Sequence, residues 1–220
     1  DLKSISKVVI IACGTAYHAG MVGKYAIERW ADVSVDVELA SEYRYREPSI
    51  DKNTLVIPIS QSGETMDTLM ALRYAKAHGA QIFSVCNTNG STIPRESDAV
   101  LYTHAGPEIA VASTKALLTQ IIAVYLIGLH LAQINGSLKD SEVKDLYKEL
   151  LELPGKIEAD PTASKPAAPQ HKPGNSPQDN PQQPSLASDH TKTLTALAGM
   201  TTLLAIVATL SYTQRAHLAR

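Results

Sequence analysis

Short apolar runs rich in β-branched residues alternate along the chain with longer segments whose apolar residues recur at helical spacing. The apolar runs predict strands over 7–13, 33–39, 53–60, 81–86 and 99–102. The longer segments predict helices over 16–31, 41–46, 65–78, 113–133 and 139–152. Apolar strands that alternate with helices are typical of a parallel sheet covered on both faces. The pattern therefore predicts an α/β fold.

The clearest candidate chemistry lies at the junction between the third strand and its helix. Residues 60–65 read Ser-Gln-Ser-Gly-Glu-Thr, with three hydroxyls, a carboxamide and a glycine where a helix begins. Helix N-termini attract anions through unpaired N–H groups, and glycine lets the backbone approach a ligand closely. No Lys or Arg lies in this loop, so neutral donors would hold a bound phosphate. The alternative is an ordinary N-cap, which needs only one hydroxyl.

The junction after the first strand, Cys-Gly-Thr-Ala at 13–16, is too short for the Gly-x-Gly-x-x-Gly motif. The chain also contains no Gly-x-x-x-x-Gly-Lys-Ser/Thr motif, so dinucleotide and nucleoside-triphosphate binding lose their usual support. By itself, Gly-Thr fits a tight turn as well as a ligand contact.

The third junction, Val-Ala-Ser-Thr-Lys at 111–115, opens the longest predicted helix. Ser113 is a plausible N-cap, whereas Lys115 in the first turn opposes the helix dipole. An anionic partner would remove this conflict. That partner is either a ligand or a carboxylate such as Glu108, and we favour the carboxylate.

Composition divides the 220 residues unevenly. Hydrophobic residues make up 44% and charged residues 19%, which is compatible with a packed core. Seven of the 12 prolines lie between 161 and 184, among Gln, Asn, Ser and Ala. Such a segment buries too little apolar surface to offset its ordering entropy. We therefore predict a globular domain over 1–157, a disordered linker over 158–191 and an apolar helical tail over 192–220.

The tail allows several interpretations. Residues 193–214 carry no charged side chain, and this segment is long enough to span a bilayer. The segment is rich in Thr and Ala, which insert less readily than Leu. A membrane anchor, a soluble helix that packs on a partner, and a non-native sequence from a fusion or frameshift all stay open.

Charge and cysteine content argue against several other classes of protein. A formal net charge of −2 and 5% aromatic residues argue against nucleic-acid binding. Cys13 and Cys86 form no pattern of a disulfide framework or zinc site, and the seven histidines show no metal-ligand spacing. No secretory leader is visible. We expect a cytoplasmic protein without metal or cofactor.

Four segments together resemble sugar isomerase (SIS) domains. They are Ala-Cys-Gly-Thr at 12–15, Val-Glu-Leu-Ala-Ser-Glu-Tyr-Arg-Tyr at 37–45, and the junctions at 60–65 and 111–115. Within that family they are most similar to the first of the two SIS domains in glutamine–fructose-6-phosphate aminotransferases, over residues 5–157. The resemblance implies a flavodoxin-like three-layer sandwich with five parallel strands, and a homodimer.

The resemblance also implies site residues and a ligand. Ser60, Gln61, Ser62 and Thr65 would hold the phosphate of a ketohexose or hexosamine 6-phosphate, with fructose 6-phosphate as first choice. Thr15, Val111, Ala112 and Ser113 would line the sugar. Ala16 departs from the family, which often carries a second hydroxyl there.

The family's acid–base groups come largely from its second SIS domain, and its glutaminase activity from another domain. Neither has a counterpart in this sequence, so we expect the chain alone to be inactive. Glu64 and His104 are the weak catalytic candidates, and a structural role for Glu64 beside the helix N-terminus is favoured. The alternative function is a non-catalytic sugar-phosphate sensor or interaction module, with or without a membrane tether through its tail.

Overall fold

The computed structural model describes residues 2–110 and 112–159. Five strands form one sheet, in the order β2-β1-β3-β4-β5, and every neighbouring pair is parallel. They are β1 (Lys7–Ala12), β2 (Ser34–Leu39), β3 (Thr54–Ser60), β4 (Gln81–Cys86) and β5 (Ala99–Tyr102). This order is flavodoxin-like. The predicted α/β class and five-stranded parallel sheet are confirmed.

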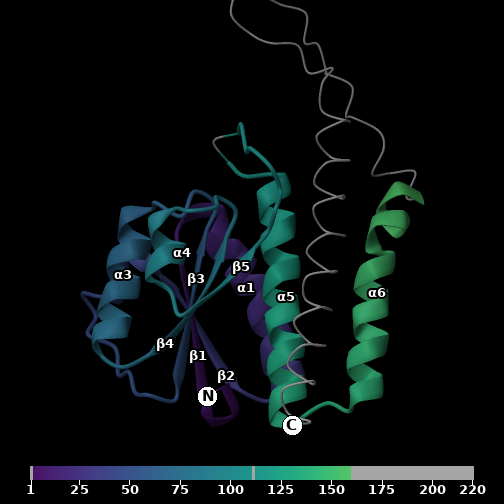
Figure 1. Ribbon diagram of the computed structural model, residues 1–220, viewed down its shortest axis with the longest axis horizontal. Helices are drawn as coiled ribbons and strands as arrows, with labels where there is room; N and C mark the ends of the chain where they lie inside the picture. Colours follow the sequence, from purple (N-terminus) through teal and green to yellow (C-terminus); the bar gives the residue numbers. More distant parts are fainter. Residues whose placement is uncertain (1, 111, 160–220) are drawn as a thin grey trace, which may run out of the picture.

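Helices cover both faces of the sheet and make the fold three-layered (Figure 1). On one face lie α1 (Gly14–Ala31) and α5 (Lys115–Asn135), and on the other α2 (Ala40–Tyr43), α3 (Met66–Ala77) and α4 (Thr92–Glu96). A short 3-10 helix, η1 (Leu2–Ser4), precedes β1, and α6 (Asp140–Ala159) packs outside α5.

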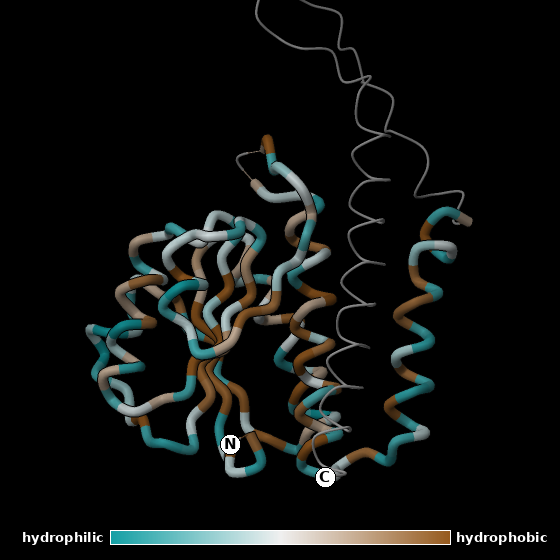
Figure 2. Tube along the Cα trace, viewed as in Figure 1, coloured by the Kyte–Doolittle hydropathy of each residue, from teal (hydrophilic) through white to brown (hydrophobic). Residues whose placement is uncertain are grey.

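Successive strand residues alternate between two buried clusters, because side chains on a strand point to opposite faces. The cluster on the α1–α5 side includes Val8, Ile10, Ile57, Ile27 and Ile127. The cluster on the α3–α4 side includes Val9, Ile11, Val56, Leu72 and Ile93. In Figure 2 the central strands are accordingly hydrophobic along most of their length. Burial on both faces explains why the strand sequences read as continuous apolar runs.

α5 is the one described helix that is long and apolar enough to cross a membrane by length and composition alone. Most of its apolar stretch, 61%, is buried inside the protein, as is common for a core helix. Gly23 of α1 explains how closely α1 and α5 pack, since a Cβ there would lie 2.2 Å from Cγ1 of Val124. α5 therefore serves as the central helix of its layer.

Several predicted helix boundaries are wrong. α2 ends at Tyr43 rather than at 46, and α5 ends at Asn135 rather than at 133. α5 begins at Lys115, two residues after the predicted start, and α4 was not predicted as a helix at all. α6 continues past Pro154 to Ala159, beyond the predicted end at 152. None of its residues is buried, so water can bind the carbonyl that Pro154 leaves without an N–H partner. From residue 160 on, the predicted linker and tail lie outside the described residues.

Candidate functional site

A cavity of about 440 Å³ opens at the carboxyl ends of β1 and β3. These central strands are the point at which the strand order reverses, where ligands of open α/β sheets bind. The volume lies in the range of small-molecule sites. The lining residues are Cys13, Gly14, Thr15, Ala16, Ile59, Ser60, Gln61, Ser62, Thr65, Ala112, Ser113 and Gln120.

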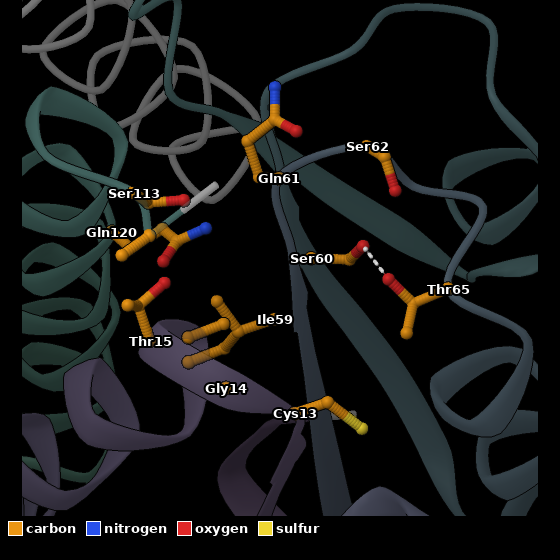
Figure 3. A pocket seen from close by; sticks show the side chains of 12 residues that line it. Cys13, Gly14, Thr15, Ile59, Ser60, Gln61, Ser62, Thr65, Ser113 and Gln120 are labelled. Atoms are coloured by element: carbon orange, nitrogen blue, oxygen red, sulfur yellow. Dashed lines mark hydrogen bonds between the residues drawn. The ribbon is translucent and has the colours of Figure 1, made fainter. Parts of the chain in front are cut away.

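The loop between β3 and α3 forms one wall of the cavity (Figure 3). The hydroxyl of Ser60 accepts the N–H of Gly63 at 3.0 Å and shares a hydrogen bond with Oγ1 of Thr65 at 3.1 Å. The hydroxyl of Ser62 accepts the N–H of Glu64 at 3.2 Å. These local bonds hold the loop in a turn beside the start of α3.

Gly63 is required at the tip of this turn. Its φ of +68° lies in the left-handed region, and a Cβ would come within 1.9 Å of Oγ of Ser91. The sequence therefore has a glycine where the loop packs directly against the segment before α4.

Thr65 occupies the N-cap position of α3, yet its side chain makes no capping hydrogen bond. Its hydroxyl bonds to Ser60 instead, so the N-cap alternative for this loop is not what the structure shows. α1 also begins at the cavity, after Cys13, without a side-chain cap. Two helix N-termini without side-chain caps thus give the cavity an electropositive character without any cationic side chain.

The opposite wall comes from the starts of α1 and α5. Thr15, Ala112 and Ser113, which the resemblance assigns to the sugar, line the cavity there. Val111 lies outside the described residues. Sequence reasoning missed Gln120, which also lines this wall. The available signal was an amide within a long apolar helix, where a polar side chain normally needs a partner.

Glu64 is directed away from the cavity lining and towards α4. Its Oε1 accepts the backbone N–H of Thr92 at 2.8 Å and the Thr92 hydroxyl at 3.1 Å. These two hydrogen bonds hold the pKa of Glu64 below its usual value. The carboxylate lies at the N-terminus of α4, whereas the sequence favoured a structural role at the start of the helix that follows the loop at 60–65.

His104 follows β5 and has a φ of +49°. The segment around it is fixed by Asn87, whose Oδ1 accepts the Thr103 hydroxyl at 3.0 Å and the N–H of Ala105 at 2.8 Å. The Asn87 amide donates to the carbonyl of Gly106 at 2.8 Å. His104 itself is not among the described residues that line the cavity.

At the start of α5, the N-cap residue is Thr114 rather than Ser113, and its side chain makes no capping bond. Glu108 supplies the cap from outside the helix. Its Oε2 accepts the N–H groups of Thr114 and Ala116, each at 3.1 Å. The Glu108 carboxylate thus places a negative charge at the positive end of the α5 dipole, where Lys115 adds a further positive charge. Lys115 itself makes no ion pair with any described residue.

The described part of the chain contains no group of three or more His, Cys, Asp or Glu residues that could hold a metal ion. The described lining of the cavity has no carboxylate, His, Lys or Arg side chain. It offers hydroxyls, carboxamides and helix N-termini, which can bind a phosphate and sugar oxygens through neutral hydrogen bonds.

Curated relatives share this sequence at high identity. The glutamine–fructose-6-phosphate aminotransferase (isomerizing) of Streptomyces coelicolor is 60% identical over 157 residues, which are 71% of this chain and 26% of that protein. The enzyme of the same name from Mycobacterium tuberculosis is 60% identical over 154 residues, 70% of this chain and 25% of that protein. The chain thus spans about a quarter of the length of these relatives.

Solved structures share the fold. The C-terminal domain of glucosamine-fructose-6-phosphate aminotransferase from Francisella tularensis has a TM-score of 0.64 and 40% identity. The match covers 71% of this chain and 48% of that one. Glucosamine-6-phosphate deaminase from Thermotoga maritima, at 19% identity and a TM-score of 0.55 over 69% of this chain and 47% of its own, supports the fold alone.

The SIS domain family matches residues 1–129, more than half of the chain. The sheet order, the cavity at its carboxyl edge and the 60% identical relatives agree with that match. The chain belongs to the SIS domain family.

Proposed function

We propose that this domain binds a ketohexose or hexosamine 6-phosphate, with fructose 6-phosphate as first choice. The observation that carries the proposal is the loop at 60–65, whose hydroxyls meet the start of α3 at the cavity. Phosphate oxygens accept hydrogen bonds from hydroxyls and from the free N–H groups of a helix N-terminus. In this role Ser60, Gln61, Ser62 and Thr65 are the phosphate ligands.

The sugar then extends towards the other wall. Thr15, Ala112 and Ser113 lie there in the structure, and Val111 joins them in the proposal through the family resemblance. The names of the 60% identical relatives specify fructose 6-phosphate and glutamine as the reactants of those enzymes. We therefore place the chain in amino-sugar biosynthesis, as the first isomerase-domain half of such an aminotransferase.

A second function, a non-catalytic sugar-phosphate sensor or interaction module, is favoured by one observation. The described lining of the cavity contains no carboxylate, His, Lys or Arg side chain that could transfer a proton to or from a sugar. Binding without turnover is therefore what this cavity supports by itself.

We propose a cytoplasmic setting and a homodimer formed through the SIS domain. The membrane alternative rests on residues 193–214, which lie outside the described residues. Within the described part, the single membrane-length helix is mostly buried in the core. That burial supports a role for α5 in the core.

Thermal denaturation of the 220-residue chain tests the proposed ligand. A ligand that binds only the folded state raises the melting temperature. We expect fructose 6-phosphate or glucosamine 6-phosphate to raise it and unphosphorylated fructose to leave it unchanged. Equal shifts from phosphorylated and unphosphorylated sugars, or no shift at millimolar concentrations, would contradict the phosphate assignment.

A further inference from the structure

Gln120 is a buried polar side chain without a partner. It lies on α5 and is 1% exposed, and neither Oε1 nor Nε2 has a hydrogen-bond partner among the described residues. Nearly all buried polar groups in folded proteins are hydrogen-bonded, because an unsatisfied amide is costly to bury. Keeping an amide at this position therefore needs an explanation.

The position of Gln120 suggests one. The side chain lines the cavity, and in Figure 3 its amide points into it from the same side as Thr15 and Ser113. Ser60 and Thr65 face it from the opposite side. A ligand whose phosphate lies at the start of α3 would extend its carbon chain across the cavity towards this amide.

We propose that Gln120 binds two oxygens of the sugar and so orients the hexose in the cavity, an inference that rests on the proposed sugar-phosphate function. A carboxamide has two N–H donors and one acceptor oxygen. Sugar hydroxyls both donate and accept, so one amide can pair with two neighbouring sugar oxygens. The ligand then supplies both partners that the protein lacks. Gln120 is a binding and positioning residue for the sugar, separate from the phosphate ligands.

This role has a consequence for stability that a structural role does not have. If the amide serves the ligand, replacing it by an apolar side chain of similar volume removes an unsatisfied buried group from the free protein. The ligand-free melting temperature should then stay the same or rise. An amide that held the fold together would instead lower the melting temperature when removed.

The experiment uses the 220-residue chain with Gln120→Leu and, as a second shape, Gln120→Met. Fructose 6-phosphate and inorganic phosphate are titrated separately and followed by NMR chemical shifts, which also report millimolar affinities. We expect about tenfold or greater weakening for fructose 6-phosphate, because hydrogen bonds to the sugar are lost. The affinity for inorganic phosphate should stay unchanged.

Thr119→Val is the matched control. Thr119 is equally buried on α5, but its hydroxyl donates to the carbonyl of Ala116 at 3.0 Å and the residue does not line the cavity. This variant should bind both ligands as the unaltered chain does. The same result with Gln120→Leu and Gln120→Met would overturn the inference and leave the proposed function standing. Failure of the unaltered chain to bind fructose 6-phosphate would contradict the proposed function, and the inference with it.

Discussion

The buried side chain of Ser60 holds the loop at 60–65 in its turn. It is 2% exposed, accepts the N–H of Gly63 and shares a hydrogen bond with Thr65. Among the described residues, the Ser62 hydroxyl has one hydrogen bond, in which it accepts the N–H of Glu64 at 3.2 Å. The hydroxyls of Ser62 and Thr65 can therefore be removed with less disturbance to the loop than that of Ser60.

Ser62→Ala and Thr65→Ala should each weaken fructose 6-phosphate binding by about tenfold to hundredfold. Each removes a hydrogen bond to a charged phosphate, worth roughly 1.5–3 kcal/mol. The hydroxyl of Thr65 does not cap α3, so its loss should cost little helix stability. Calorimetric titration measures the affinity, and chemical denaturation measures the stability separately.

Lys115→Ala serves as the control for both variants. Lys115 does not line the cavity. The N–H groups at the start of α5 beside it already have an acceptor in the Glu108 carboxylate. Phosphate affinity should stay nearly unchanged. If Lys115→Ala abolished binding while both loop variants bound normally, the phosphate would lie at the start of α5 instead.

At the scale of elements, α5 depends on a cap that comes from the preceding segment. Glu108→Ala should lower the free energy of unfolding by about 1 kcal/mol, because two first-turn N–H groups lose their acceptor and the helix dipole loses its counter-charge. Urea denaturation measures the change. Glu149→Ala removes an exposed glutamate from the middle of α6 and is the matched control. Equal losses in the two variants would contradict the capping role.

The same helix carries a group that makes stability depend on pH. Burial lowers the pKa of His130 below its usual value. The unfolded chain therefore binds a proton more readily, near pH 6.5, than the folded chain does. Stability that is present above about pH 6.5 is lost as the pH falls through the lowered pKa.

His130→Gln removes this titration. The unaltered chain should lose more free energy of unfolding between pH 7.5 and pH 5.5 than the variant does. Chemical denaturation at both pH values measures the two differences. Identical pH dependence in the two proteins would show that His130 is protonated as easily in the folded state as in the unfolded one.

At the scale of the whole molecule, the described lining of the cavity has no carboxylate, His, Lys or Arg side chain that could transfer a proton to or from a sugar. We expect the purified 220-residue chain to form no glucosamine 6-phosphate from fructose 6-phosphate, with either glutamine or ammonia. A general base has to lie within hydrogen-bond reach of the substrate, and the described lining holds no carboxylate, His, Lys or Arg. Chromatographic detection of the product would contradict this and make Glu64 and His104 the first residues to mutate.

The sequence by itself determined the sheet and the location of the loop at 60–65. Strands buried on both faces must be apolar throughout, and helices that cover them must be apolar on one side, so both leave local patterns. The hydroxyl-rich loop at 60–65 was visible because its residues are contiguous. Its place at the edge of the sheet followed from the strand before it and the helix after it.

Only the tertiary structure decided which side chains meet across long separations. The short helix α4 was missed because Glu64, 28 residues earlier, binds its first turn. At shorter range, the sequence favoured Glu108 as the anionic group at the start of α5 but expected Ser113 to cap the helix, and the structure shows that the Glu108 carboxylate itself accepts the first-turn N–H groups. Gln120 was missed because the helical spacing of buried positions is the same whether a position faces the core or a cavity. Local periodicity encodes which side of an element is buried, whereas the partner on that side is fixed by packing.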